Sequence, residues 1–276
     1  MAVVAAGGGW HPRFDDSFAW EDDATLLFAH RGARMGVPEN SRAALEQARA
    51  LGFRAVEVDV RRTSDGTLAL FHDKTTRRML GIDAAFGELT LAQLRAHKLQ
   101  VEGRDSGHTV PTLQEVFQRF GPSLLFYLDM KDKDFEAADE VAALIDAFGM
   151  HERTVVASVD PLFIAYLEHH HPAVNTALER FDFAQVWLYR LIPSRWKPDY
   201  LAGLARKVTP QHVEWLAEEG LKSKRIVYGV DSTQYDRMIG LGIAKLIVGY
   251  DLEVHSGELS RGARVESALA GPRPER

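Results

Sequence analysis

The chain has 276 residues, of which 46% are hydrophobic, and a formal net charge of −6. The length suits one large α/β domain, and the acidic balance argues against nonspecific nucleic-acid binding, which needs a basic face to neutralise phosphates. The absence of cysteine excludes disulfides, zinc–thiolate sites and cysteine nucleophiles. The N-terminus lacks a basic segment and no stretch reaches ~18 apolar residues, so we expect a soluble cytoplasmic protein.

The first half of the chain alternates short apolar runs with helical patterns. Residues 1–25 form an irregular acidic lead-in. Strands are predicted over 26–29, 55–60 and 67–71, and a helix over 41–51 that ends at Gly52. Residues 74–121 show no strand character, but contain two helical stretches, 91–96 and 113–120, for which Thr90 and Thr112 are plausible N-caps.

The same alternation continues in the second half. Strands are predicted over 124–130, 154–158, 175–178, 225–230 and 245–250, with helices over 135–148, 162–170, 209–219 and up to residue 241. The segment 181–207 fits neither pattern clearly. Residues from about 260 form a polar C-terminal tail.

Strands that alternate with helices favour a parallel sheet with the helices outside. About eight strand candidates in some 250 residues favour an α/β TIM-type (β/α)8 barrel over residues 26–259, with a small insertion after the second strand. A doubly wound sheet is the alternative, but His30-Arg31-Gly32-Ala33 is no dinucleotide-binding fingerprint.

Polar residues stand at the ends of four apolar strands, where a barrel has its active-site mouth. They are His30-Arg31, Glu57 with Asp59, His72-Asp73, and Asp129 with Lys131.

Glu57 and Asp59 are two residues apart in a strand, so their side chains point to the same face. Two carboxylates beside apolar neighbours repel each other and are costly to desolvate, which a divalent cation would offset. Oxygen ligands suit one Mg²⁺ or Ca²⁺ ion, with Asp129 as a third ligand. Alternatively, the pair is neutralised by one of the nearby arginines, Arg54, Arg61 and Arg62.

His30 and His72 are suited to general acid–base catalysis, because imidazole titrates near neutral pH. A lone histidine after a strand is more often structural, but two that flank a carboxylate pair favour a catalytic role. Arg31 and Lys131 offer positive charge for a phosphate, or each simply pairs with an acid.

These residues belong to a series of motifs. In order, the motifs are His30-Arg31-Gly32, Pro38-Glu39-Asn40, Glu57-Val58-Asp59-Val60, Thr63-x-Asp65-Gly66, His72-Asp73, Leu89-Thr90-Leu91 with Leu94, and Val110-Pro111-Thr112-Leu113-x-Glu115. The series resembles the signature of the glycerophosphodiester phosphodiesterase family, closely so over residues 27–131.

The resemblance implies a role for each matching residue. His30 and His72 would be the catalytic acid/base pair, and Glu57, Asp59 and Asp129 would hold the metal. Four residues would bind or support the substrate: Arg31, Glu39, Lys131 and Tyr228. Asn40 would cap the helix that follows it. In this family a neighbouring substrate hydroxyl typically attacks phosphorus, which gives a cyclic phosphate that water then opens.

Two regions depart from the family pattern. Asp129 stands where many members have glutamate, which shortens one metal ligand. The last strand reads Val248-Gly249-Tyr250-Asp251 instead of Thr-Asp-x-Pro, and Tyr228 stands where tryptophan is usual. These changes affect the pocket rim and therefore the headgroup preference.

The remaining features concern the substrate. The apolar segment 186–193 would suit contact with a membrane or an acyl chain through Trp187, or is a buried strand and loop. Ser158 and Glu179 end strands and are candidates for the pocket wall. The leading hypothesis is hydrolysis of a small glycerophosphodiester such as glycerophosphocholine. Alternatives are a lysophospholipase D, which acts on lysolipids, and a non-catalytic phosphate-ester binding barrel; the oligomeric state stays open.

Overall fold

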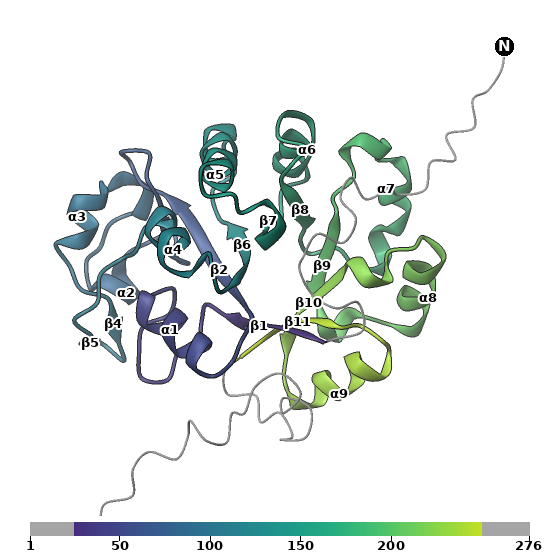
Figure 1. The fold of residues 1–276 in the computed structure, drawn as a ribbon, viewed down its shortest axis with the longest axis horizontal. Coiled ribbons are helices and arrows are strands. Elements are labelled where there is room, and N and C mark those ends of the chain that lie inside the picture. Colours follow the sequence, from purple (N-terminus) through teal and green to yellow (C-terminus); the bar gives the residue numbers. More distant parts are fainter. Residues whose placement is uncertain (1–24, 250–276) are drawn as a thin grey trace, which may run out of the picture.

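The computed structural model describes residues 25–249, in which eight parallel strands close into a barrel. The strands follow one another in the order β1-β11-β10-β9-β8-β7-β6-β2, and β2 pairs again with β1. Figure 1 shows the helices arranged around these strands. The predicted TIM barrel is confirmed. Its strands are β1 (Leu26–His30), β2 (Ala55–Arg62), β6 (Leu125–Met130), β7 (Thr154–Ser158), β8 (Asn175–Leu178), β9 (Tyr200–Leu204), β10 (Arg225–Val230) and β11 (Lys245–Val248).

Most helices around the barrel begin directly after an N-cap residue whose side chain accepts a backbone hydrogen bond. Ser41, Thr112 and Thr209 each accept a hydrogen bond from a backbone N–H in the first turn of the following helix. Asp134, Asp160 and Asp231 cap in the same way. The outer helices are α1 (Arg42–Ala50), α4 (Leu113–Phe120), α5 (Phe135–Phe148), α6 (Pro161–His170), α7 (Val186–Leu191), α8 (Pro210–Glu218) and α9 (Ser232–Gly240).

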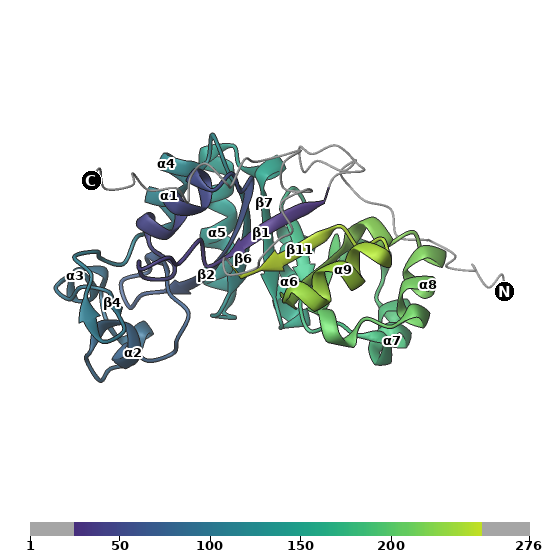
Figure 2. The same ribbon diagram turned by 90° about the horizontal axis from the view of Figure 1, so that it is seen from below.

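An insertion between β2 and α4 extends the barrel on one side, as predicted. It contains β3 (Leu68–Leu70), α2 (Arg77–Leu80), α3 (Leu91–Arg95) and a hairpin of β4 (Gln100–Val101) with β5 (Arg104–Asp105). Figures 1 and 2 both place α2, α3 and β4 away from α7 and α8. Its core includes Phe71 and Phe86, whose rings stack with centroids 4.7 Å apart.

Two expectations about the strands are wrong, and one barrel strand was not predicted. The hairpin of β4 and β5 lies in the stretch 74–121, where no strand was expected. The third predicted strand, 67–71, is not a barrel strand, because β3 pairs antiparallel with the outer end of β2. The eighth barrel strand is β9 instead, within the segment 181–207 that the sequence pattern left unassigned. The predicted lead-in over 1–25, except for residue 25, and the predicted tail from 260 lie outside the described residues.

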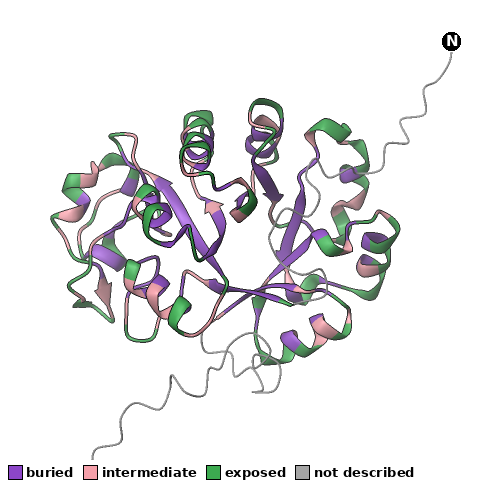
Figure 3. Ribbon diagram, viewed as in Figure 1, coloured by how far each residue is buried: buried purple, intermediate pink, exposed green. Residues whose placement is uncertain are grey.

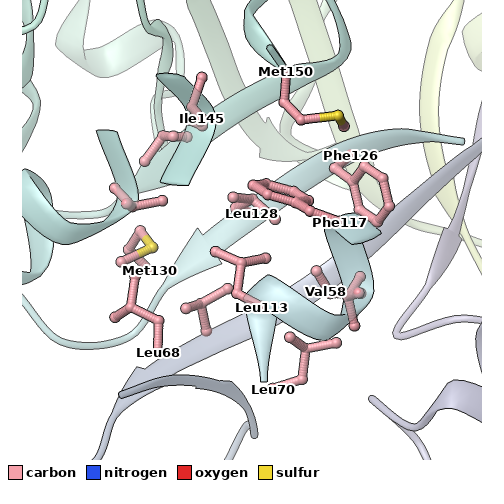
Figure 4. Close-up of a cluster of buried hydrophobic side chains, with 14 of the residues drawn as sticks. Val58, Leu68, Leu70, Leu113, Phe117, Phe126, Leu128, Met130, Ile145 and Met150 are labelled. Atoms are coloured by element: carbon pink, nitrogen blue, oxygen red, sulfur yellow. The ribbon is translucent and has the colours of Figure 1, made fainter. Parts of the chain in front are cut away.

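Alternation along each strand separates two layers of core. Inward-facing side chains such as Phe28, Ala55 and Tyr127 form the barrel interior. Outward-facing side chains pack under the helices, as Figure 4 shows for Val58 and Leu128 against Phe117 of α4. In Figure 3 the barrel strands are almost entirely buried and the helices are exposed on their outer sides.

The apolar segment 186–193 is neither a buried strand nor a wall of the barrel. It forms α7, in which Tyr189 is fully buried but Trp187, Leu188 and Leu191 are 59%, 44% and 71% exposed. The expectation of a buried strand there is therefore wrong. No helix among the described residues is long and apolar enough to cross a bilayer.

Glu115, in the first turn of α4, contacts Arg95 of the insertion and Arg42 of α1. Its carboxylate accepts hydrogen bonds from the Thr112 N–H (3.0 Å) and from Arg95 (2.5 Å), and it ion-pairs with Arg42 (2.8 Å). Burial opposes the shift, but these donors lower the pKa of Glu115 from 4.5 to about 2.

We expect Glu115→Gln to lower the free energy of unfolding by about 1–2 kcal/mol at pH 7, less than the full pKa shift implies because solvent screens this partly exposed group. The folded pKa lies below the unfolded one, so the contribution is present above pH 4.5 and is lost as the pH falls toward 2. Urea unfolding at pH 7 and pH 3 measures both values. Glu214→Gln, on the exposed face of α8, is the control; an equal loss at both pH values would contradict the ionic origin.

Candidate active site

One large cavity of about 1780 Å³ lies at the carboxyl ends of the barrel strands. Seven of the nine predicted site residues line it: His30, Arg31, Glu57, His72, Asp129, Lys131 and Tyr228. The other two, Glu39 and Asp59, are buried and contact Arg31. The strand ends therefore bring together the residues that the sequence pattern singled out.

Three carboxylates meet at this end of the barrel. Glu57 and Asp59 point inward from β2, and Asp129 stands directly beside Asp59 on β6. One oxygen of each lies within 4.8 Å of one oxygen of the others. Glu57 and Asp59 are 4% and 1% exposed, so their charges have little access to water. These three residues define the carboxylate cluster.

Two cations partly neutralise the carboxylate cluster. The Lys131 ammonium pairs with Asp129 and lies 2.8 Å from Asp59 Oδ1, and the Arg31 Nε lies 3.1 Å from Asp59 Oδ2. Arg61 and Arg62 pair instead with acids of the α5 region, Asp132 and Glu140, so the alternative in which they neutralise the cluster is wrong.

The three carboxyl groups of the cluster differ in the direction of their pKa shifts. Burial, then Asp59 and Asp129, raise the pKa of Glu57 well above its usual range. Burial likewise raises the pKa of Asp129, against the opposing effect of Lys131. Burial also acts on Asp59, but Lys131 and Arg31 outweigh it and lower its pKa. Three carboxylates thus stand against two nearby cations, Arg31 and Lys131.

The donor set of the carboxylate cluster fits a hard divalent cation. All its ligand atoms are carboxylate oxygens, which suit Mg²⁺ or Ca²⁺. The buried Asp59 Oδ1 makes no hydrogen bond of acceptable geometry, although Lys131 is near it, so this oxygen is available as a ligand. Burial and the neighbouring carboxylates raise the pKa values of Glu57 and Asp129, and a bound cation would lower them and keep these groups ionised.

A tight turn after β1 positions His30 and Arg31. Arg31 has a φ of +57°, and its N–H donates to Glu57 Oε2 at 2.9 Å. Gly32 follows with a φ of +76°, and a Cβ at this position would lie 2.8 Å from Ala44, so α1 packs here only against glycine. Burial, then Arg31, lowers the pKa of His30 to about 4, which keeps its ring neutral at pH 7.

Asn40 supports the site in a way that was not expected. Its predicted role as a helix cap is wrong, because Ser41 caps α1. Instead its side chain donates to Asp59 Oδ2 at 2.7 Å and accepts from the Asp59 N–H at 3.0 Å. Its φ of +52° is one that asparagine tolerates better than most residues. Asn40 therefore fixes the orientation of one member of the carboxylate cluster.

His72 is oriented by a chain of ion pairs. Its Nδ1 lies 2.7 Å from Asp73 Oδ1, and Asp73 in turn pairs with Arg78 at 2.6 Å. Arg78 also pairs at 2.6 Å with Glu39, which binds Arg31 at 3.0 Å. Burial alone would raise the pKa of Asp73, but the hydrogen bonds with Arg78 and His72 outweigh burial and lower this pKa to about 2. Asp73 stands inside the His-Asp motif, so the sequence held the signal, whereas the role of Arg78 depends on the folded insertion.

The wall across the cavity contains Tyr228 and Glu179. Tyr228 is half-buried at the end of β10. Glu179 follows β8 and accepts a hydrogen bond from the Tyr127 hydroxyl at 3.0 Å. Burial, then Asp129, raises the pKa of Glu179 to about 8. Ser158 is fully buried and does not line the cavity, because it is the outward neighbour of the inward-facing Ala157.

Several known proteins share sequence with this chain. A glycerophosphodiester phosphodiesterase of Caldanaerobacter subterraneus is 33% identical over 136 residues, which are 48% of this chain and 52% of the relative. Human glycerophosphodiester phosphodiesterase 1 is 31% identical over 164 residues, 56% of this chain and 49% of the relative. The chain thus matches about half the length of each of these curated relatives.

Solved structures show the same fold. A putative glycerophosphoryl diester phosphodiesterase from Silicibacter pomeroyi superimposes with a TM-score of 0.71 at 22% identity, over 89% of this chain and 96% of the other. A phosphodiesterase from Oleispira antarctica, solved with the product sn-glycerol-3-phosphate, gives 0.71 at 19% identity over 90% and 98%. The sequence profile of the glycerophosphoryl diester phosphodiesterase family matches residues 30–247, and the chain belongs to this family.

Proposed function

We propose that this protein is a metal-dependent phosphodiesterase that hydrolyses glycerophosphodiesters, glycerophosphocholine among them, to glycerol phosphate and an alcohol. The observation that carries the proposal is the carboxylate cluster, of which Glu57 and Asp129 line the same cavity as two histidines and the cations Arg31 and Lys131. Family membership and the glycerol phosphate bound to the Oleispira relative support the same class of substrate.

A divalent cation held by Glu57, Asp59 and Asp129 would stabilise negative charge on the phosphoryl oxygens and acidify a nearby hydroxyl. The fit of the carboxylate cluster to Mg²⁺ or Ca²⁺ supports this assignment. Lys131 would then face the substrate phosphate as a point charge, and Arg31 would offer the guanidinium edge that is not engaged by Glu39 and Asp59.

The two histidines have environments that suit opposite roles. His30 is neutral at pH 7 and can accept a proton, so we assign it as the general base that activates the attacking hydroxyl. His72 has a carboxylate at Nδ1, which fixes the ring and provides a counter-charge for its protonated form. We assign His72 as the general acid that protonates the leaving oxygen.

A lysophospholipase D activity is the second candidate. The exposed Trp187, Leu188 and Leu191 of α7 would suit contact with a lipid surface. None of them lines the cavity, however, and the side chains that do are largely polar or charged. This lining favours the small diester over the lysolipid as the substrate.

We expect His30→Ala and His72→Ala each to lower kcat/KM for glycerophosphocholine by roughly 10²–10⁴-fold, because each removes a proton-transfer group. Phosphorus NMR measures the turnover, and circular dichroism checks the fold. His108→Ala, which changes an exposed histidine of the insertion outside the main cavity, is the matched control. Near wild-type turnover by either active-site variant would show that the assigned mechanism is wrong.

Chelation should abolish turnover, and Mg²⁺ or Ca²⁺ should restore it. Calorimetric titration of the chelated protein with each ion measures binding independently of activity. We expect Asp59→Asn to weaken binding by roughly 10–100-fold, since it removes one charge and disturbs the Asn40 contact. Asp236→Asn, on the exposed side of α9, should leave binding unchanged. Full activity after exhaustive chelation would contradict the metal assignment.

A further inference from the structure

Glu179 is a carboxyl group in the cavity wall that the proposed chemistry does not use. It follows β8, three strands around the barrel from β2, and continues the inward-facing row that includes Ala177. Glu179 lines the same cavity as Glu57 and Asp129, so it borders the same space as the carboxylate cluster. A substrate phosphate held at the cluster would therefore have its organic part within reach of Glu179.

The carboxyl group is held in place by a built contact. Tyr127, which is fully buried in the barrel interior, donates its hydroxyl to Glu179 Oε1 at 3.0 Å. On β7 and β8, Ala157 and Ala177 are inward-facing residues that lie nearer the carboxyl ends of the strands than the register position of Tyr127. Their small side chains leave room for the contact between Tyr127 and Glu179. Oε2 has no hydrogen-bond partner among the described residues, and Glu179 lines the cavity. One oxygen is thus anchored and the other faces the substrate space.

We propose that Glu179 determines specificity by hydrogen-bonding the free terminal hydroxyl of the substrate's glycerol, and so selects glycerophosphodiesters over lysolipids that are acylated at that hydroxyl. The proposal rests on the proposed function and names the part of the substrate that this wall recognises. An acyl ester cannot donate a hydrogen bond there, and its chain would desolvate the carboxyl without compensation.

Charges of both signs surround Glu179. Asp129 of the carboxylate cluster and the cations Lys131, Arg31 and Arg180 all line the same cavity. A hydroxyl carries no charge, so a hydrogen bond between it and Glu179 does not depend on the balance of these charges. A half-buried carboxyl group such as that of Glu179 can hydrogen-bond a hydroxyl in either protonation state.

The test compares glycerophosphocholine with propane-1,2-diol phosphocholine, which lacks the terminal hydroxyl but keeps the 2-hydroxyl. We expect the wild type to prefer glycerophosphocholine in kcat/KM by roughly 10–100-fold. Glu179→Leu should lose this preference, whereas Glu179→Gln should keep most of it because an amide still bonds a hydroxyl. Glu168→Gln, a buried glutamate outside the cavity that bonds Thr176, should match the wild type.

A binding arm separates this proposal from the proposed function. Calorimetry with sn-glycerol 3-phosphate and propane-1,2-diol 1-phosphate, in the presence of Mg²⁺ or Ca²⁺, needs no turnover, and we expect Glu179→Leu to weaken only the first ligand. Turnover of both diesters at equal rates by the wild type, or an unchanged preference in Glu179→Leu, would overturn the role of Glu179. If no diester is turned over, the proposed function fails, and the ligand preference still decides the role of Glu179.

Discussion

The structure depends on three carboxylates placed on the inward face of a barrel, where apolar residues would ordinarily stand. The two-residue period of β2 forces Glu57 and Asp59 onto one face, and the register with β6 adds Asp129. Their mutual repulsion in a poorly solvated space has to be offset by positive charge. Arg31 and Lys131 supply part of it, two cations beside three carboxylates.

The same constraint explains why the insertion is part of the site. Arg31 is held to the cluster by Glu39, and Glu39 is shared with Arg78 from the insertion. Arg78 fixes Asp73, which fixes His72. A chain of alternating charges thus connects Asp59 of the carboxylate cluster to His72. Because each charge in the chain is balanced by its neighbours, a change at Glu39 affects both ends of the site.

Short-range patterns were enough to predict the features that depend on neighbours in sequence. The alternation of valines with Glu57 and Asp59 predicted a strand with its acids on one face, and Thr90 and Thr112 predicted two helix starts. Features that depend on distant partners were missed. Asn40 stands in the loop before α1, as a cap would, but its partner Asp59 lies on β2, distant in sequence. The short strand β9 lies in a segment without a clear hydrophobic period, and it is defined by its pairing with β8 and β10.

The opposite environments of the two histidines follow from their positions around the barrel. His30 is the last residue of β1 and lies beside Glu57 and the turn that contains Arg31. Burial and the charge of Arg31 lower its pKa and keep its ring neutral despite the nearby carboxylates. A further cation at the cluster would oppose protonation of His30 even more strongly. His72 stands at the entrance to the insertion, where Asp73 rather than an arginine contacts its ring. The two rings therefore differ in their charged surroundings, a difference that the sequence indicates only through the residue that follows each histidine, Arg31 or Asp73.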